Sequence, residues 1–456
     1  MFELPLAPEQ SASFTATRNA CNTCTPLGAC LVFRGIEGAI PLLHGSQGCS
    51  TYIRRYLIGH FREPVDIASS NFSESAAVYG GGTVFRTGLE NVIRQYAPAL
   101  VGIATTCLSE TIGDDVRLYL HEFRRAHEGQ TLPELVHVST PSYSGTHAEG
   151  FHAAVKAVVA ALAEGGPAGG HVNVLPGMVS PADLRYLKEV LADFGLAGTL
   201  LPDYADPLDG ATWDEYQRLP AGGTPVAALR GMGRAAATLE FGATLDPGQS
   251  AAALLQQRFG VRRHGLNLPI GVRASDAFFE VLAGCAGRPV SDKHRAERGR
   301  LVDAYIDGHK YLFGKRAVVY GEEDLVVALA SFLGEVGVRP VLCASGGRSG
   351  RLAAALQLLG PEAAAITARE GTDFMELEEA AAAVRPDLLI GSSKGYPLAR
   401  KLSVPLVRVG FPIHDRVGAA RVHHLGYRGT HELFDRIVNT LIAAQQDGDP
   451  TGYMNF

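Results

Sequence analysis

The sequence predicts an α/β protein with mostly parallel sheets. Two observations carry this prediction: apolar runs of strand length recur along the chain, and a helical pattern follows most of them after a short turn. Consecutive parallel strands need such crossover helices, because a tight turn cannot join strands that run in the same direction. We therefore expect helices on both faces of each sheet and functional side chains beyond the carboxyl ends of the strands.

The expected elements follow this rhythm along the chain. The run 99–107 (ALVGIATTC) is typical of a buried strand, and the run 171–177 (HVNVLPG) leads into a helix that begins after Ser180 with Pro181 at its first position. The same unit recurs towards the carboxyl end. Further strands are expected in KRAVVYG (315–321), RPVLCASGG (339–347), RPDLLIGSSKG (385–395) and VPLVRVGFP (404–412).

Two breaks in this pattern predict three Rossmann-like domains. The glycine- and proline-rich segment AEGGPAGG lies near residue 165, and the charged segment SDKHRAERGR ends at residue 300. We expect an N-terminal α/β domain over 1–165 that carries the site, a second domain over 166–300, and a third over 301–456.

Composition narrows the class of protein. The chain has 456 residues, of which 46% are hydrophobic, and its formal net charge is −6. No basic tract indicates a nucleic-acid partner, and no apolar stretch is long enough for a membrane span. The N-terminus lacks the basic and apolar regions of a signal peptide, so we expect a cytoplasmic protein. In that compartment the seven cysteines are expected to be buried thiols or metal ligands rather than disulfides.

Three cysteines have the local sequence of metal ligands. Cys24 begins CTPLGA, Cys49 ends HGSQGC, and Cys107 ends the predicted strand ALVGIATTC. A thiolate in a glycine turn or at a strand end has no packing role, and such positions suit iron–sulfur ligands. We expect the fold to bring these three side chains together.

The remaining cysteines are interpreted as bystanders. The spacing Cys21-x2-Cys24-x5-Cys30 also fits a local zinc or 4Fe-4S loop, but no second cysteine or histidine pair follows to complete it. Cys21 and Cys30 are therefore expected to be non-ligands. Cys285 and Cys343 lie in apolar surroundings and are expected to be buried thiols.

Other polar and glycine residues near the predicted strand ends leave alternatives open. His44 fits either a hydrogen-bonded scaffold residue or a neighbour of a cluster, and Gly45 and Gly48 would let backbone amides approach sulfides closely. Ser142 follows another apolar run, so its hydroxyl either points into the same crevice or caps a turn. The glycine run 80–82 matches neither a dinucleotide-binding nor a Walker motif, and we expect no ATP hydrolysis by this chain.

These motifs resemble one family in order and spacing. CTPLGA, HGSQGC, TTCLSETIGDD, STPSYSGTH, VRVGFPIHDR and HHLGYRGT are similar to the β-type subunit of nitrogenase component 1 and its relatives, over nearly the whole chain. In the catalytic β-type subunit, three cysteines hold one half of an 8Fe-7S P-cluster shared with the α-type subunit, and a nearby serine can bind iron when that cluster is oxidised. The resemblance implies that the matching metal-binding residues here are Cys24, Cys49, Cys107 and Ser142.

The family contains two different functions. One is the β-type subunit of a nitrogenase-like reductase, and the other is the β-like subunit of the scaffold on which the iron-molybdenum cofactor precursor is assembled. The segments HFREP, LSET, LPDYADPLDG and GGTP, and the absence of a long N-terminal extension, are closer to the scaffold. The familiar scaffold subunit, however, contributes only the cysteine matching Cys49, to a 4Fe-4S cluster.

Ligand number favours the reductase. An eight-iron cluster needs several thiolates from each subunit, which explains why all three cysteines and the serine are present. The resemblance then implies a heterotetramer of two α-type and two β-type subunits, served by an ATP-dependent 4Fe-4S reductase homodimer, with a catalytic iron-sulfur cofactor in the α-type partner and no catalytic residue in this chain. Departures from the molybdenum-type subunit favour a reductase of another substrate, such as the methylthio-alkane reductases.

Overall fold

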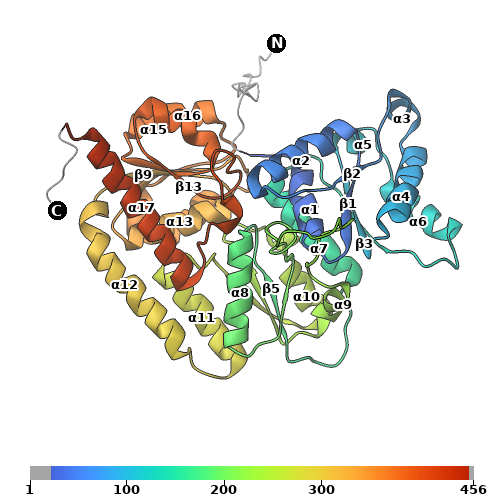
Figure 1. Cartoon of the computed structure of the whole chain (residues 1–456), viewed down its shortest axis with the longest axis horizontal. Helices are drawn as coiled ribbons and strands as arrows, with labels where there is room; N and C mark the ends of the chain where they lie inside the picture. The colour runs from blue at the N-terminus through green and yellow to red at the C-terminus, as the bar shows by residue number, and fades with distance from the viewer. Residues whose placement is uncertain (1–21, 451–456) are drawn as a thin grey trace, which may run out of the picture.

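The structure, a computed structural model, describes residues 22–450 and shows an α/β protein with three separate sheets. Every strand pairing within these sheets is parallel. Figure 1 shows three lobes, each a sheet flanked by helices, that follow one another in chain order. The predicted fold class is confirmed, whereas Cys21 lies outside the described residues.

The first sheet holds the strands that precede the candidate site. Its strands are β1 (Ala39–His44), β2 (Ala68–Ser69), β3 (Leu100–Thr105) and β4 (Glu134–Val138). They lie in the order β2-β1-β3-β4, and β1 and β3 are buried along their whole lengths because helices cover both faces. The helices in this part of the chain are α1 (Thr25–Arg34), α2 (Gln47–Phe61), α3 (Glu74–Tyr79), α4 (Gly82–Tyr96), α5 (Cys107–Thr111), α6 (Val116–Ala126) and α7 (His147–Leu162).

The second sheet follows the glycine-rich connection after α7. Its strands are β5 (Val172–Leu175), β6 (Gly198–Leu200), β7 (Ala237–Phe241) and β8 (Arg262–Leu266), in the order β6-β5-β7-β8. Its helices are α8 (Pro181–Asp193), α9 (Val226–Gly231), α10 (Ala251–Phe259), α11 (Val272–Ala286) and α12 (Asp292–Leu312), with 3₁₀ turns at Met232–Arg234 and Pro247–Gln249.

The third sheet has five strands. These are β9 (Arg316–Tyr320), β10 (Arg339–Ala344), β11 (Thr367–Arg369), β12 (Leu388–Gly391) and β13 (Leu406–Arg408), in the order β11-β10-β9-β12-β13. Its helices are α13 (Glu323–Glu335), α14 (Leu352–Gln357), α15 (Phe374–Val384), α16 (Tyr396–Leu402) and α17 (Gly426–Gly448), with 3₁₀ turns at Pro361–Ala365, Ser393–Gly395 and Ala419–Arg421.

The three sheets share one hydrophobic core. The largest buried cluster runs from Leu27 to Leu441 and includes side chains from all three sheets. Helix α12 continues unbroken through residue 300. The charged segment that ends at this residue therefore forms the first half of α12 and is not a linker. α12 packs along α17 (Figure 1), and the start of α17 contacts the beginning of α11, where the Tyr427 hydroxyl donates to Asp276. One sheet lies within each predicted range, and the division into 1–165, 166–300 and 301–456 stays a prediction.

No helix among residues 22–450 is both long and apolar enough to cross a membrane.

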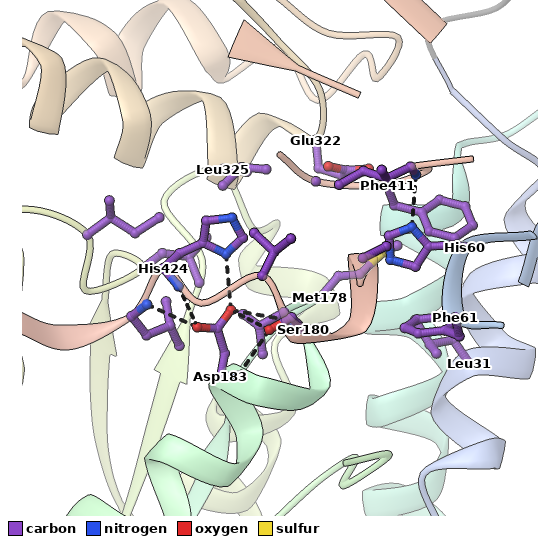
Figure 2. Close-up of a pocket in the computed structure, with 18 residues that line it drawn as sticks. Leu31, His60, Phe61, Met178, Ser180, Asp183, Glu322, Leu325, Phe411 and His424 are labelled. Carbon is purple, nitrogen blue, oxygen red and sulfur yellow. Dashed lines mark hydrogen bonds and ion pairs between the residues drawn. The ribbon is translucent and has the colours of Figure 1, made fainter. Parts of the chain in front are cut away.

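A buried, hydrogen-bonded pair of side chains, Asp183 and His424, joins α8 to the segment before α17. Asp183 forms a capping box with Ser180 at the start of α8, and it also accepts hydrogen bonds from the backbone amides of His424 (2.8 Å) and Leu425 (3.0 Å). The His424 ring lies 3.2 Å from the same carboxylate, beside a cavity of about 40 Å³ (Figure 2). Burial alone would raise the pKa of Asp183, but His424 outweighs it and lowers that pKa from 3.8 to about 2.

This pair predicts a pH-dependent contribution to stability. A lowered folded pKa stabilises the protein above pH 3.8, and that contribution is lost as the pH falls towards 2. We expect Asp183→Asn to lower the free energy of unfolding by roughly 2 kcal/mol at neutral pH, with the gap to the unmodified chain closing in that acidic window. Denaturant titrations across the window measure it. Asp292→Asn, at an exposed side chain, is the control, and a gap that does not change with pH would contradict the prediction.

Candidate metal centre

Three predicted site residues follow neighbouring strands of the first sheet. Cys49 lies in the first turn of α2 after β1, Cys107 is the first residue of α5 after β3, and Ser142 lies in the loop after β4. The order β1-β3-β4 makes these strands adjacent and parallel, so their carboxyl ends meet at one edge. Cys49 and Ser142 are 93 positions apart in the sequence, so it is the fold that brings them to the same edge.

Cys24 reaches the same edge on a different support. It is the N-cap residue of α1, and α1 crosses α7 at backbone contact distance. A Cβ on Gly28 would lie 1.8 Å from the carbonyl oxygen of His147, and one on Gly150 would lie 1.9 Å from that of Thr25. Only glycine permits this crossing, which fixes the start of α1 against α7.

Direct interactions connect the four side chains. The backbone amide of Ser142 donates to Cys107 Sγ over 3.2 Å, and the Ser142 side chain lies near enough to Cys24 to lower the pKa of its thiol. Burial raises the pKa of the Cys24 thiol; Ser142 partly offsets this, and the nearby Cys49 and Cys107 raise it further. Cys49 and Cys107 are therefore close enough to Cys24 for their negative charge to disfavour a thiolate at Cys24.

The chemistry of this donor set fits an iron–sulfur cluster. All three thiols are free, with Cys107 exposed and Cys24 and Cys49 half-buried. Within residues 22–450, no three His, Cys, Asp or Glu side chains are placed to hold a single metal ion. The three thiols are near one another but do not converge on a point where one ion could bind. This arrangement fits a cluster of several irons, whose positive charge would compensate that of the thiolates.

Three large side chains beside the thiols are exposed. Tyr52, Leu108 and Tyr143 surround the site with exposed fractions of 41%, 39% and 68%. Burial and the neighbouring Tyr56 raise the pKa of the Tyr52 hydroxyl, and the nearby Cys24 adds to this effect. Exposed apolar side chains gathered around a site indicate a surface that another protein covers.

The other described cysteines lie away from this edge. Cys30 is fully buried inside α1, about 9 Å along the helix axis from Cys24. This distance argues against a local metal-binding loop that contains both cysteines. Cys343 is fully buried in β10, where burial raises its pKa to about 12, so the prediction of a buried thiol is confirmed there. Cys285 is only half-buried in α11.

His44 is a scaffold residue. It is fully buried, its Nδ1 lies 3.0 Å from the Ser70 hydroxyl, and its Nε2 lies 2.9 Å from Asp114. Asp114 also accepts from the backbone amide of Gly81 and from the Tyr119 hydroxyl. The IGDD motif and the glycine run 80–82 are thus explained together, as parts that hold the end of β1 in place.

Of the alternatives left open around Gly45, the structure supports a role of its backbone amide inside the fold. This amide donates to the Ser70 hydroxyl over 3.1 Å, so it is already satisfied inside the protein. The glycine is needed for space, because a Cβ there would lie 2.2 Å from the Thr106 hydroxyl. Gly48 differs, since a Cβ there would meet nothing closer than 3.6 Å.

Sequence reasoning missed two residues that contact the segment before Cys24. The side-chain amide of Asn22 donates a hydrogen bond to the carbonyl oxygen of Gly346. The ring of His147 accepts one from the backbone amide of Thr23. His147 lies within the quoted motif STPSYSGTH, at the first position of a helix, and this was the available signal. No local sequence pattern could have indicated the role of Asn22, because its hydrogen-bond partner is 324 positions away in the sequence.

Comparisons with known proteins agree on one family. The model for nitrogenase component 1 type oxidoreductases matches residues 24–442. The chain is 38% identical over 435 residues to a nitrogenase molybdenum-iron protein beta chain of Methanothermobacter marburgensis, which covers 93% of this chain and 94% of the relative. It is 35% identical over 452 residues to the nitrogenase iron-molybdenum cofactor biosynthesis protein NifN of Bradyrhizobium diazoefficiens, covering 96% and 93% respectively.

The architecture gives the same answer. A solved structure described as nitrogenase Cp1 at pH 6.5 matches with a TM-score of 0.92 and 33% identity, over 100% of this chain and 98% of that chain. The relatives include both beta chains and a cofactor biosynthesis protein. The chain belongs to the nitrogenase component 1 type oxidoreductases, and within them to the β-type subunits.

Proposed function

We propose that this chain is the β-type subunit of a nitrogenase-like reductase, and that Cys24, Cys49, Cys107 and Ser142 hold one half of an 8Fe-7S P-cluster at the interface with an α-type subunit. The observation that carries the proposal is the meeting of three free thiols and one serine at a single sheet edge. The exposed apolar side chains around that edge supply the surface that the α-type subunit would cover.

The residues of this chain would bind, shield and tune the cluster. Burial raises the pKa of Cys24, so iron must displace its proton at neutral pH, and loading should release protons. The amide of Ser142 already donates to Cys107 Sγ, a contact that stabilises negative charge on a ligand sulfur. When bound, the cluster would supply one-electron transfer from an ATP-dependent 4Fe-4S reductase homodimer towards a catalytic iron-sulfur cofactor in the α-type subunit.

A second function has support from one comparison. The cofactor biosynthesis relative from Bradyrhizobium covers 96% of this chain at 35% identity, close to the values for the beta chains. In a scaffold of that kind, the resemblance implies a 4Fe-4S cluster held on this side by Cys49 alone. Cys24, Cys107 and Ser142 would then have no metal-binding role, and this difference can be tested.

Ser142→Ala separates the two functions. In the P-cluster reading the reduced complex should be unchanged, whereas the oxidised complex should show altered EPR signals and a shifted midpoint potential, because a serine oxygen anion suits the more oxidised iron. Ser144→Ala is the matched control, since Ser144 lies in the same turn and its hydroxyl donates only to Pro141. Identical redox behaviour of Ser142→Ala and the unmodified complex would favour the scaffold.

A further inference from the structure

The two residues before Cys24 are held by contacts from distant parts of the chain. The backbone amide of Thr23 donates to Nδ1 of His147 over 3.3 Å, and the His147 amide donates back to the Thr23 carbonyl over 3.0 Å. Asn22 donates its side-chain amide to the Gly346 carbonyl over 2.9 Å. Cys24 therefore begins α1 from a segment whose position is set by α7 and by the loop after β10.

His147 connects this segment to the third sheet. Its Nε2 lies 2.8 Å from the carboxylate of Glu322, which follows β9, and its side chain is 5% exposed. Because Nδ1 accepts from an amide, the ring proton is on Nε2 and is donated to Glu322. One neutral imidazole thus satisfies both contacts, and it joins the metal-binding edge of the first sheet to the third sheet.

Packing gives this segment limited support on one side. A cavity of about 710 Å³ lies between the first and third sheets, and Asn22, Ser142, His147 and Glu322 are among its lining residues. Side chains that border a cavity lose the close contacts that would otherwise fix them. The hydrogen bonds of Thr23 and Asn22 therefore add, on this side, to the support that the crossing of α1 and α7 gives the Cys24 backbone.

We propose that His147 is a positioning residue for Cys24, which it holds in place through the Thr23 amide while Glu322 fixes the orientation of the imidazole. The role towards a cluster rests on the proposed function, but the effect on the Cys24 backbone does not. Two substitutions of His147 each keep one of the two hydrogen bonds that its ring makes and remove the other. Asparagine places an acceptor near Nδ1 and keeps the Thr23 contact, whereas glutamine places a donor near Nε2 and keeps the Glu322 contact.

The first test uses the full-length chain without metal. We expect iodoacetamide to alkylate Cys24 about fivefold faster in His147→Gln than in the unmodified chain, the factor that corresponds to one net hydrogen bond. His147→Asn should stay within about twofold. Exposed Cys107 is the internal control and should react equally in all three, as measured by peptide mass spectrometry. Equal rates at Cys24 in the unmodified chain and in His147→Gln, or an acceleration in His147→Asn as large as in His147→Gln, would overturn the proposal.

The second test uses the complex with the α-type subunit. We expect His147→Gln to shift the cluster midpoint potential and His147→Asn to retain it, while thermal unfolding of the two variants stays similar. If the unmodified complex holds no P-cluster, the proposed function fails, but the alkylation result still decides the role of His147. If the cluster is present and its potential is the same in all three proteins, the positioning role is overturned.

Discussion

Replacing Cys107 with alanine is expected to remove most of the cluster iron and the turnover of the complex. The thiol is exposed, so the substitution should change the free energy of unfolding by less than about 0.5 kcal/mol. Loss of iron would then reflect a missing ligand rather than a damaged fold, because an iron without its thiolate is under-coordinated. Cys24→Ala and Cys49→Ala should behave alike.

Two other cysteines are matched controls for this experiment. Cys343→Ala removes a fully buried thiol from β10 and should cost stability through lost packing, with iron content unchanged. Cys285→Ala, at a half-buried position in α11, should leave both quantities nearly unaltered. Iron analysis and EPR provide the measurement. Full cluster occupancy in Cys107→Ala would remove that residue from the ligand set.

Gly28→Ala is expected to destabilise the chain by about 3 kcal/mol and to reduce cluster iron as well. The added methyl group would lie 1.8 Å from the carbonyl oxygen of His147 and 2.6 Å from the amide nitrogen of Phe151. Both are backbone atoms of α7, so relief requires α1 to move away from α7, and Cys24 would move with the start of α1. Denaturant unfolding and iron analysis of the same preparations measure the two effects.

Gly48→Ala provides the contrast for that prediction. Gly48 lies in the first turn of α2, next to Cys49, and a methyl group there would make only an ordinary contact, 3.6 Å from the Ser46 hydroxyl. We expect a change within about 1 kcal/mol, on the stabilising side, because alanine favours helix. Unmodified stability in Gly28→Ala would show that the close crossing of α1 and α7 does not fix Cys24.

The sequence predicted the sheet edge well, because its strands are short apolar runs buried on both faces. β1 and β3 are of this kind, and their carboxyl ends had to meet once both strands were parallel neighbours. Cys107 and Ser142 were placed at that edge by this argument. Cys24 was not, since its position depends on a helix crossing between residues more than 100 positions apart, which no local pattern reports.

Two further features also depend on tertiary neighbours. Residues 292–300 of the charged segment lie within the continuous helix α12, where Lys293 pairs with Glu189 and Asp193 of α8, and Arg298 pairs with Asp276 of α11. Charges that have partners on neighbouring helices can lie inside a continuous helix. For Gly45 the sequence left a structural role and a role beside a cluster open, and a tertiary neighbour, the Thr106 side chain, explains the glycine.

Iron quantitation combined with low-temperature EPR on the purified complex with the α-type subunit tests the central claim most directly. The complex should be compared in the dithionite-reduced state and after stepwise oxidation, with the metals of the α-type cofactor counted separately. We predict eight irons at each interface of an α-type and a β-type subunit, with signals that change on oxidation and respond to Ser142→Ala. Four irons at each interface, unaffected by Cys24→Ala and Cys107→Ala, would contradict the P-cluster assignment and identify the chain as a scaffold subunit.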